Sequence, residues 1–113
     1  MPAALIVFIG GGLGATLRWA VTLFVGAPVA TWLVNIVGSF GLAWLTARGF
    51  GSESSRLLLG TGLMGGFTTY STFNQDTLLA LEEGSIARAA LNVVVTLLVC
   101  LMAGGLGFWF GRR

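Results

Sequence analysis

The sequence is poor in charged residues and has neither lysine nor histidine. Charged side chains account for 9% of its 113 residues, whereas hydrophobic ones account for 56%. A soluble globular domain carries about 25% charged residues, so this composition excludes an ordinary soluble protein. Cys100 is the only cysteine, which rules out an intrachain disulfide. With no histidine and one thiol, the chain also lacks the usual ligands of a zinc site.

The basic residues are all arginines, and the net charge is only +2. They are spread over the ends of hydrophobic runs and the linkers between them. A nucleic-acid surface needs a basic patch interleaved with aromatic residues, and the sequence has none. We therefore expect no nucleic-acid partner, and we interpret the arginines as interfacial anchors and topology signals.

Long hydrophobic runs fill nearly the whole chain. Since one helical span needs about 20 mostly apolar residues, the length permits at most four spans and almost no extramembrane domain. We predict an all-α integral membrane protein that forms a single four-helix domain, residues 1–113, within the lipid bilayer. The predicted spans are residues 3–25, 29–47, 57–81 and 86–110, and Ser85 is a candidate N-cap for the last.

The third hydrophobic run is interrupted at residues 65–73, which read GGFTTYSTF. Two glycines and four serine or threonine residues lie there inside an otherwise apolar segment. A bilayer interior offers no water to satisfy free backbone groups, so non-helical backbone survives only where it is buried in protein or lines a polar cavity. The sequence therefore predicts a broken third helix that marks an ion or substrate site.

Polar side chains recur every four residues on two other predicted helices, so each row lies along one helix face. The rows are Thr31, Asn35 and Ser39 on the second helix, and Asn92, Thr96 and Cys100 on the fourth. Rows of this kind often serve only to hold membrane helices together. Because they accompany a broken helix, we favour a shared water-accessible path.

Two charged residues, Arg18 and Asp76, lie inside the predicted spans beyond their first turns. An intramembrane charge is by default a functional candidate, although one near a helix end can extend to the interface. Arg18 fits either description. Asp76 lies just past the break, where it would cap or orient the loop, or pair with Arg18. We favour a structural or vestibule role for these two residues.

Three segments together closely resemble the Fluc (CrcB) family of fluoride channels. They are residues 12–19 (GLGATLRW), 35–40 (NIVGSF) and 65–73, and the last is the most specific. The resemblance covers the whole chain. It implies an antiparallel dual-topology homodimer with two fluoride pathways along the subunit interface and a structural Na⁺ at its centre. It also implies passive export of toxic cytoplasmic fluoride across the bacterial inner membrane.

The resemblance assigns roles by motif position. It implies that the backbone carbonyls of Gly65 and Thr68 from both subunits bind Na⁺, for which carbonyl oxygens are suitable hard ligands. Tyr70 and Phe73 match two aromatic positions whose electropositive ring edges face fluoride. Asn35 would donate its amide to the ion or orient a ring. Further candidate hydroxyl donors are Thr31, Ser39, Ser71, Thr72 and Thr96.

The sequence departs from the family pattern at two positions. Tyr70 stands where phenylalanine is usual, so its hydroxyl adds a donor or draws water to the site. Asn92 occupies a fourth-helix position where the family often has tyrosine.

Two alternatives come from other functional classes. A proton-coupled small multidrug transporter has a similar length, but it needs a membrane-embedded carboxylate, usually in the first helix. This first helix has none, and Asp76 is the only candidate. A membrane scaffold would use the polar rows only for helix packing. An enzyme is not expected, because no combination of nucleophile, base and orienting group is visible.

Overall fold

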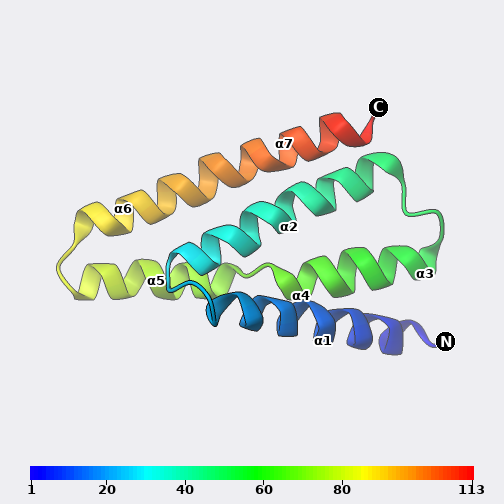
Figure 1. The fold of residues 1–113 in the computed structure, drawn as a ribbon, viewed down its shortest axis with the longest axis horizontal. Coiled ribbons are helices and arrows are strands. Elements are labelled where there is room, and N and C mark those ends of the chain that lie inside the picture. Colours follow the sequence, from blue (N-terminus) through cyan, green and yellow to red (C-terminus); the bar gives the residue numbers. More distant parts are fainter.

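The computed structural model describes residues 1–113 and contains only helices and turns (Figure 1). The α-helical elements are α1 (Ala3–Thr22), α2 (Val29–Arg48), α3 (Glu53–Ser55), α4 (Gly65–Phe67), α5 (Tyr70–Glu82), α6 (Ile86–Val94) and α7 (Cys100–Gly111). Two π-helical segments, η1 (Arg56–Met64) and η2 (Val95–Val99), continue these helices without a turn. The prediction of an all-helical protein is confirmed.

The chain runs four times along the long axis of the molecule, so both termini lie at the same end (Figure 1). The molecule measures 48 × 31 × 21 Å. Its length is close to the ~40–45 Å of a bilayer with its headgroup regions. Three continuous helices are long and apolar enough to cross a membrane: Ala3–Thr22, Val29–Arg48 and Ile86–Gly111. The protein is therefore a multi-pass membrane protein.

The remaining pass is interrupted. It consists of α3, η1 and α4 on one side and α5 on the other, separated by the extended residues Thr68 and Thr69. The predicted break within residues 65–73 is confirmed, and it is confined to these two residues.

The helix ends follow from local hydrogen bonds. The first span was predicted to reach residue 25, but α1 ends at Thr22, whose hydroxyl donates back to the Trp19 carbonyl at 2.5 Å. Ser85 accepts a hydrogen bond from the Arg88 backbone N–H at 3.2 Å, so its predicted role as the N-cap of α6 is confirmed. Gly84 precedes it with φ of 80°, a conformation that favours glycine.

Glycines let the long helices approach closely. Gly10 of α1 faces the backbone of η1 at Leu58 and Gly62, and a Cβ at Gly10 would overlap the Leu58 carbonyl. Gly107 of α7 likewise lies against the Phe40 backbone of α2. Lipid tails are as apolar as leucine, so membrane helices associate largely through such tight van der Waals contact. These contacts fix α1 against the first part of the broken pass and α2 against α7.

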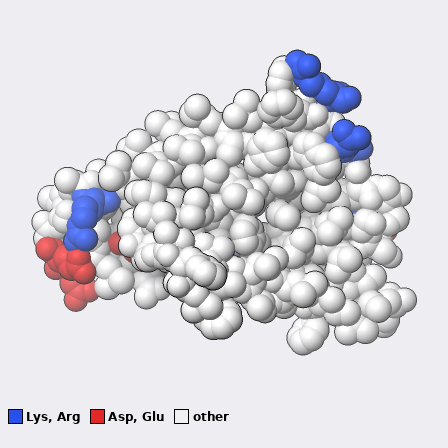
Figure 2. Space-filling model, in the orientation of Figure 1, with Lys and Arg blue, Asp and Glu red and all other residues white.

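The outer surface is apolar along its middle and charged at its two ends (Figure 2). Large hydrophobic side chains such as Phe8 and Phe24 are exposed there, as expected for a surface that meets lipid. Arginines stack on aromatic rings at one end, where the Arg113 guanidinium carbon lies 3.7 Å from the Trp109 ring centroid. Arg56 pairs with Glu53 at 2.6 Å, and this hydrogen bond lowers the pKa of the Glu53 carboxyl.

Candidate functional site

The break in the third pass is closed by one side chain from α2. The Asn35 Nδ2 atom donates to the Thr69 carbonyl at 2.9 Å, and the Thr69 N–H donates to Asn35 Oδ1 at 2.8 Å. One amide thus satisfies both backbone groups of a residue that has left the helix. Free backbone groups are costly within a bilayer, so this paired bond is what permits an extended residue at this depth. Asn35 therefore lies at the break and holds the Thr69 backbone.

Threonine side chains form hydrogen bonds to the helix ends on both sides of the break. The Thr68 hydroxyl donates to the Met64 carbonyl at 2.9 Å and terminates the first half of the pass. The Thr69 Oγ1 atom accepts from the Thr72 N–H at 3.2 Å and caps the N-terminus of α5. Threonine is a weak helix former whose short side chain competes for backbone hydrogen bonds, which explains why the helix stops here.

These bonds release two carbonyl groups. In an uninterrupted helix the Thr69 N–H would donate to the Gly65 carbonyl, and the Thr72 N–H would donate to the Thr68 carbonyl. Instead these N–H groups bond to Asn35 Oδ1 and to Thr69 Oγ1. The Gly65 and Thr68 carbonyl oxygens are thereby freed from their helical donors. They are neutral, hard oxygen ligands, so the local chemistry fits a small cation such as Na⁺.

Arg18 and Asp76 do not pair with each other. The Arg18 Nε atom donates to the Gly66 carbonyl at 3.1 Å, so the guanidinium of α1 supports the end of α4. Asp76 Oδ2 accepts from the Thr31 hydroxyl at 2.9 Å, which ties α5 to α2. The two ion pairs of the molecule are Arg56 with Glu53 and Arg88 with Glu83. Of the alternatives raised by the sequence, pairing between Arg18 and Asp76 is therefore not the one observed.

An open cavity of about 300 Å³, whose wall includes several hydroxyl-bearing residues, lies beside the break. Three passes of the chain contribute side chains to its wall: α2, the break itself and the last helix. Its polar lining residues are Asn35, Ser39, Thr68, Thr69, Tyr70 and Thr96, with Cys100 beside them. Most members of the two predicted polar rows thus meet at the broken helix.

Thr96 is the least satisfied polar group of this cavity. Its Oγ1 atom is buried and has no hydrogen-bond partner. Buried hydroxyl groups are normally hydrogen-bonded, so this exception makes Thr96 a candidate donor. Because the atom is buried in the single chain, a ligand would reach it only after a shift of the neighbouring side chains. Thr96 lies in the π-helical segment η2, and π-helical turns often occur at functional sites.

The aromatic candidates Tyr70 and Phe73 lie at the start of α5. Their ring centroids are 5.4 Å apart and their planes meet at 62°, an edge-to-face arrangement. Phe73 is buried at 8% exposure, whereas Tyr70 is 77% exposed. The pair thus runs from the interior of the bundle to its surface.

Other predicted residues lie away from the main cavity. Thr31 and Thr72 line a smaller cavity of about 150 Å³ together with Arg18 and Thr69. Ser71 is exposed, with its hydroxyl 3.2 Å from that of Thr69. These residues surround the break without joining the cavity of Asn35 and Thr96.

The polar residues of the fourth-helix row do not all reach the same cavity. Thr96 and Cys100 reach the cavity at the break, but Asn92 bonds instead to Trp32, Phe73 and Thr77. Sequence reasoning did not single out Trp32 or Thr77. The only available signal was the four-residue spacing of Thr77 from Phe73, which brings its hydroxyl to the Phe73 carbonyl.

A helical multi-pass membrane protein with a broken helix and a cavity lined by hydroxyl-bearing residues at the break has the architecture of a channel or transporter for a small polar solute. Comparison with known sequences identifies the family of the chain. The model of the family described as "CrcB-like protein, Camphor Resistance (CrcB)" matches residues 5–108, and this chain belongs to that family.

Curated relatives align over nearly the whole chain. Two proteins named "Fluoride-specific ion channel FluC", from Shewanella sp. (strain ANA-3) and Shewanella oneidensis, are 41% identical to it. A protein of the same name from Shewanella halifaxensis is 40% identical. In each case the alignment covers 95% of this chain and 94% of the relative.

Proposed function

We propose that this protein is a fluoride-selective ion channel that lets cytoplasmic fluoride leave the cell passively and so confers fluoride resistance. The observation that carries the proposal is the helix break bound by Asn35, which borders an open groove lined by hydroxyl-bearing residues and lies near the unpaired, buried Thr96 hydroxyl. The relatives named as fluoride-specific ion channels support the choice of ion. The protein is thus a channel and not an enzyme.

The chemistry of the cavity suits a small, strongly hydrated anion. A pore for such an ion must replace its water with several donors, yet bind weakly enough to release it. The cavity wall carries hydroxyl and amide groups but no arginine, because Arg18 donates to the Gly66 carbonyl from a different cavity. Neutral donors in series therefore favour passage over tight capture.

The proposed pathway comprises the aromatic pair and the hydroxyl groups around it. Phe73 and Tyr70 present ring edges, whose positive potential attracts an anion without binding it strongly. Asn35, Ser39, Ser71, Thr72 and Thr96 supply polar groups along the pathway. Thr31 also belongs to the proposed set, but its hydroxyl proton is directed to Asp76, so it would donate to fluoride only after that bond opens.

We further propose that two copies form an antiparallel dual-topology homodimer in the bacterial inner membrane, surrounded by lipid. The exposed Tyr70 ring and the apolar faces of the single chain support a second copy as the cover. Na⁺ would lie at the centre, held by the Gly65 and Thr68 carbonyls of both subunits, where it would neutralise the facing carbonyl dipoles. Replacement of Na⁺ by N-methylglucamine should then lower the melting temperature of the dimer.

A proton-coupled carrier is less well supported by the same geometry. Such a carrier needs an accessible carboxylate in its substrate site. Asp76 accepts the Thr31 hydroxyl and lines a separate cavity beside Glu83 and Arg88, not the one at the break.

Fluoride efflux from liposomes that hold the purified protein tests the function. A K⁺ gradient with valinomycin allows charge to be compensated, and chloride efflux is measured in parallel. Selective fluoride efflux that needs valinomycin is expected for an electrogenic channel. Absence of fluoride flux from folded dimers would contradict the proposal.

A further inference from the structure

Asn92 is the most deeply buried polar side chain of the protein, at 2% exposure. Its Oδ1 atom accepts from the Trp32 Nε1 atom at 2.6 Å. Its Nδ2 atom donates to the Thr77 hydroxyl at 2.8 Å and to the Phe73 carbonyl at 3.3 Å. Both amide protons are thus engaged, so Asn92 has no free donor for an anion. Its role must lie in what it holds.

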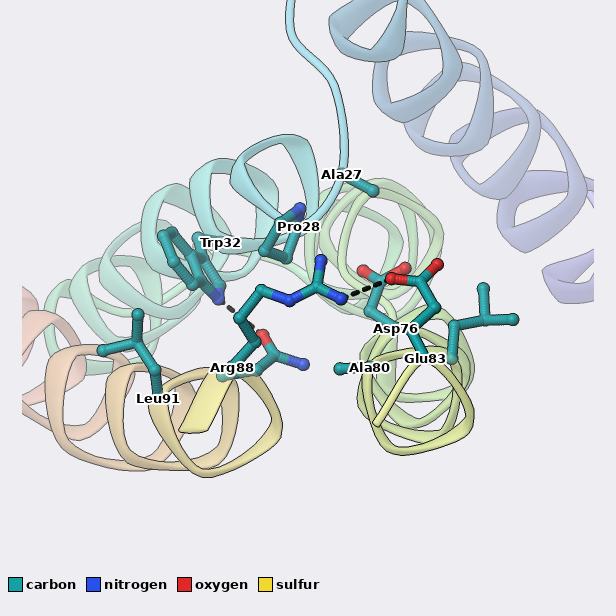
Figure 3. Close-up of a pocket in the computed structure, with 10 residues that line it drawn as sticks. Ala27, Pro28, Trp32, Asp76, Ala80, Glu83, Arg88 and Leu91 are labelled. Carbon is teal, nitrogen blue, oxygen red and sulfur yellow. Dashed lines mark hydrogen bonds and ion pairs between the residues drawn. The ribbon is translucent and has the colours of Figure 1, made fainter. Parts of the chain in front are cut away.

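The network joins three helices next to a second cavity of about 300 Å³, which is distinct from the one at the break. Figure 3 shows this cavity, with Trp32 and Pro28 on one wall and Asp76 on the opposite one. Arg88 extends across it to Glu83 (Figure 3). Asn92 lines this cavity and not the proposed fluoride pathway.

The orientation of the Asn92 amide is fixed by its partners. The Trp32 indole N–H can only donate, and the Phe73 carbonyl can only accept. A side chain between them must therefore accept on one side and donate on the other. An asparagine amide does both in one planar group, and Trp32 selects the orientation in which Nδ2 faces α5.

The Phe73 carbonyl lies in the first turn of α5, just after the break. It receives the Thr77 hydroxyl at 2.9 Å in addition to the Asn92 amide. Two side-chain donors, one from α5 and one from α6, thus hold this turn. The Phe73 and Tyr70 rings project from the same turn, so a rotation of α5 about its axis would displace both.

We propose that Asn92 is a positioning residue for the aromatic pair. By bonding the Phe73 carbonyl and the Thr77 hydroxyl, it sets the rotation of the first turn of α5 and hence the direction of the two ring edges. Trp32 acts one step further away, by fixing the Asn92 amide. This inference rests on the proposed fluoride pathway, because the consequence for transport requires that the rings face the ion.

The test uses Tyr70, the only tyrosine of the chain, as a spectroscopic probe. In protein labelled with ¹³C-tyrosine, the single ring signal depends on the nearby Phe73 ring. Asn92→Leu keeps a similar side-chain volume but removes the donor and the acceptor. We expect it to shift the Tyr70 ring signal and to lower fluoride efflux at least about fivefold, the effect of losing about 1 kcal/mol.

The matched control is Thr46→Val, which removes a hydroxyl that bonds within α2 to the Leu42 carbonyl, 14 residues along α2 from Trp32, the α2 partner of Asn92. It should leave both the Tyr70 signal and the efflux unchanged. If Asn92→Leu does not fold, Trp32→Phe removes one bond of the network and Thr77→Val removes two. Each should change the same two readouts in the same direction, by a smaller amount.

The signal and the flux must change together. Folded Asn92→Leu protein with normal efflux, or with reduced efflux and an unshifted Tyr70 signal, would overturn the inference. Wild-type protein that conducts no fluoride in the same liposomes would instead contradict the proposed function, and the Tyr70 signal would still report whether Asn92 holds the rings.

Discussion

The contact of α2 with α7 and its contact with the broken pass differ in chemistry. Against α7, α2 packs backbone to backbone at Gly107 and Gly111, and the polar side-chain contact between the two helices is that of Ser39 with the weakly bonding Cys100 thiol. Against the broken pass, Asn35 and Thr31 form three hydrogen bonds to Thr69 and Asp76. The difference shows that close packing shapes the regular part of the bundle, while polar bonds are concentrated where the backbone leaves the helix.

This comparison predicts that a substitution in the packed region should affect folding most strongly. A Cβ at Gly107 would overlap the Phe40 carbonyl, so Gly107→Leu should force the helices apart at a cost of about 3 kcal/mol or more. We expect loss of a monodisperse peak in size-exclusion chromatography and a lower melting temperature. Gly105→Leu is the matched control, because a Cβ there meets nothing within 4 Å. Equal damage from both variants would disprove the packing argument.

A substitution at the break should instead affect transport. Phe73→Ile removes the polarised ring edge while retaining an apolar side chain, so it should abolish fluoride efflux from liposomes and leave the dimer intact. Phe8→Ile, on the exposed face of α1, is the control and should conduct normally. Unchanged flux in Phe73→Ile would remove Phe73 from the pathway.

Thr96→Val should lower fluoride flux without lowering the stability of the protein. The hydroxyl is buried without a partner, so its removal costs no hydrogen bond of the protein and should leave the melting temperature unchanged or slightly raised. Fluoride efflux should fall about fivefold if one donor worth about 1 kcal/mol is lost to the ion. A fall in stability with normal efflux would indicate that Thr96 serves packing alone.

The smallest effect is expected for Tyr70→Phe. The ring edge toward Phe73 is retained, and the Tyr70 hydroxyl forms none of the hydrogen bonds that hold the break. Efflux should therefore remain close to that of the wild type. Complete loss would show that the tyrosine hydroxyl is essential in this protein.

Much of this organisation could be predicted from the sequence. Glycines and threonines inside an apolar run indicated the break. Four-residue spacing put Asn35 and Thr96 each in a polar row along one helix face, and the structure brings both residues to the cavity at the break. These predictions succeeded because they depend on helical periodicity and on the cost of free backbone groups in lipid.

The partners of individual side chains could not be predicted in the same way. Periodicity shows which residues share a face, but not which neighbouring helix that face meets. Spacing did not show, for example, that Arg18 bonds to the Gly66 carbonyl and not to Asp76. It also did not show that the Asn92 amide bonds to α5 while Thr96, on the same row, reaches the cavity. Trp32 gave no signal, because its indole N–H acts only through a residue 60 positions away.

We propose that one amide, that of Asn35, maintains the break beside which fluoride passes. The most direct test is fluoride efflux from liposomes carrying Asn35→Leu that elutes as a folded dimer. This variant removes both bonds to Thr69, so we expect loss of fluoride efflux while the glycine contacts between the long helices remain. Efflux equal to that of the wild type would contradict it.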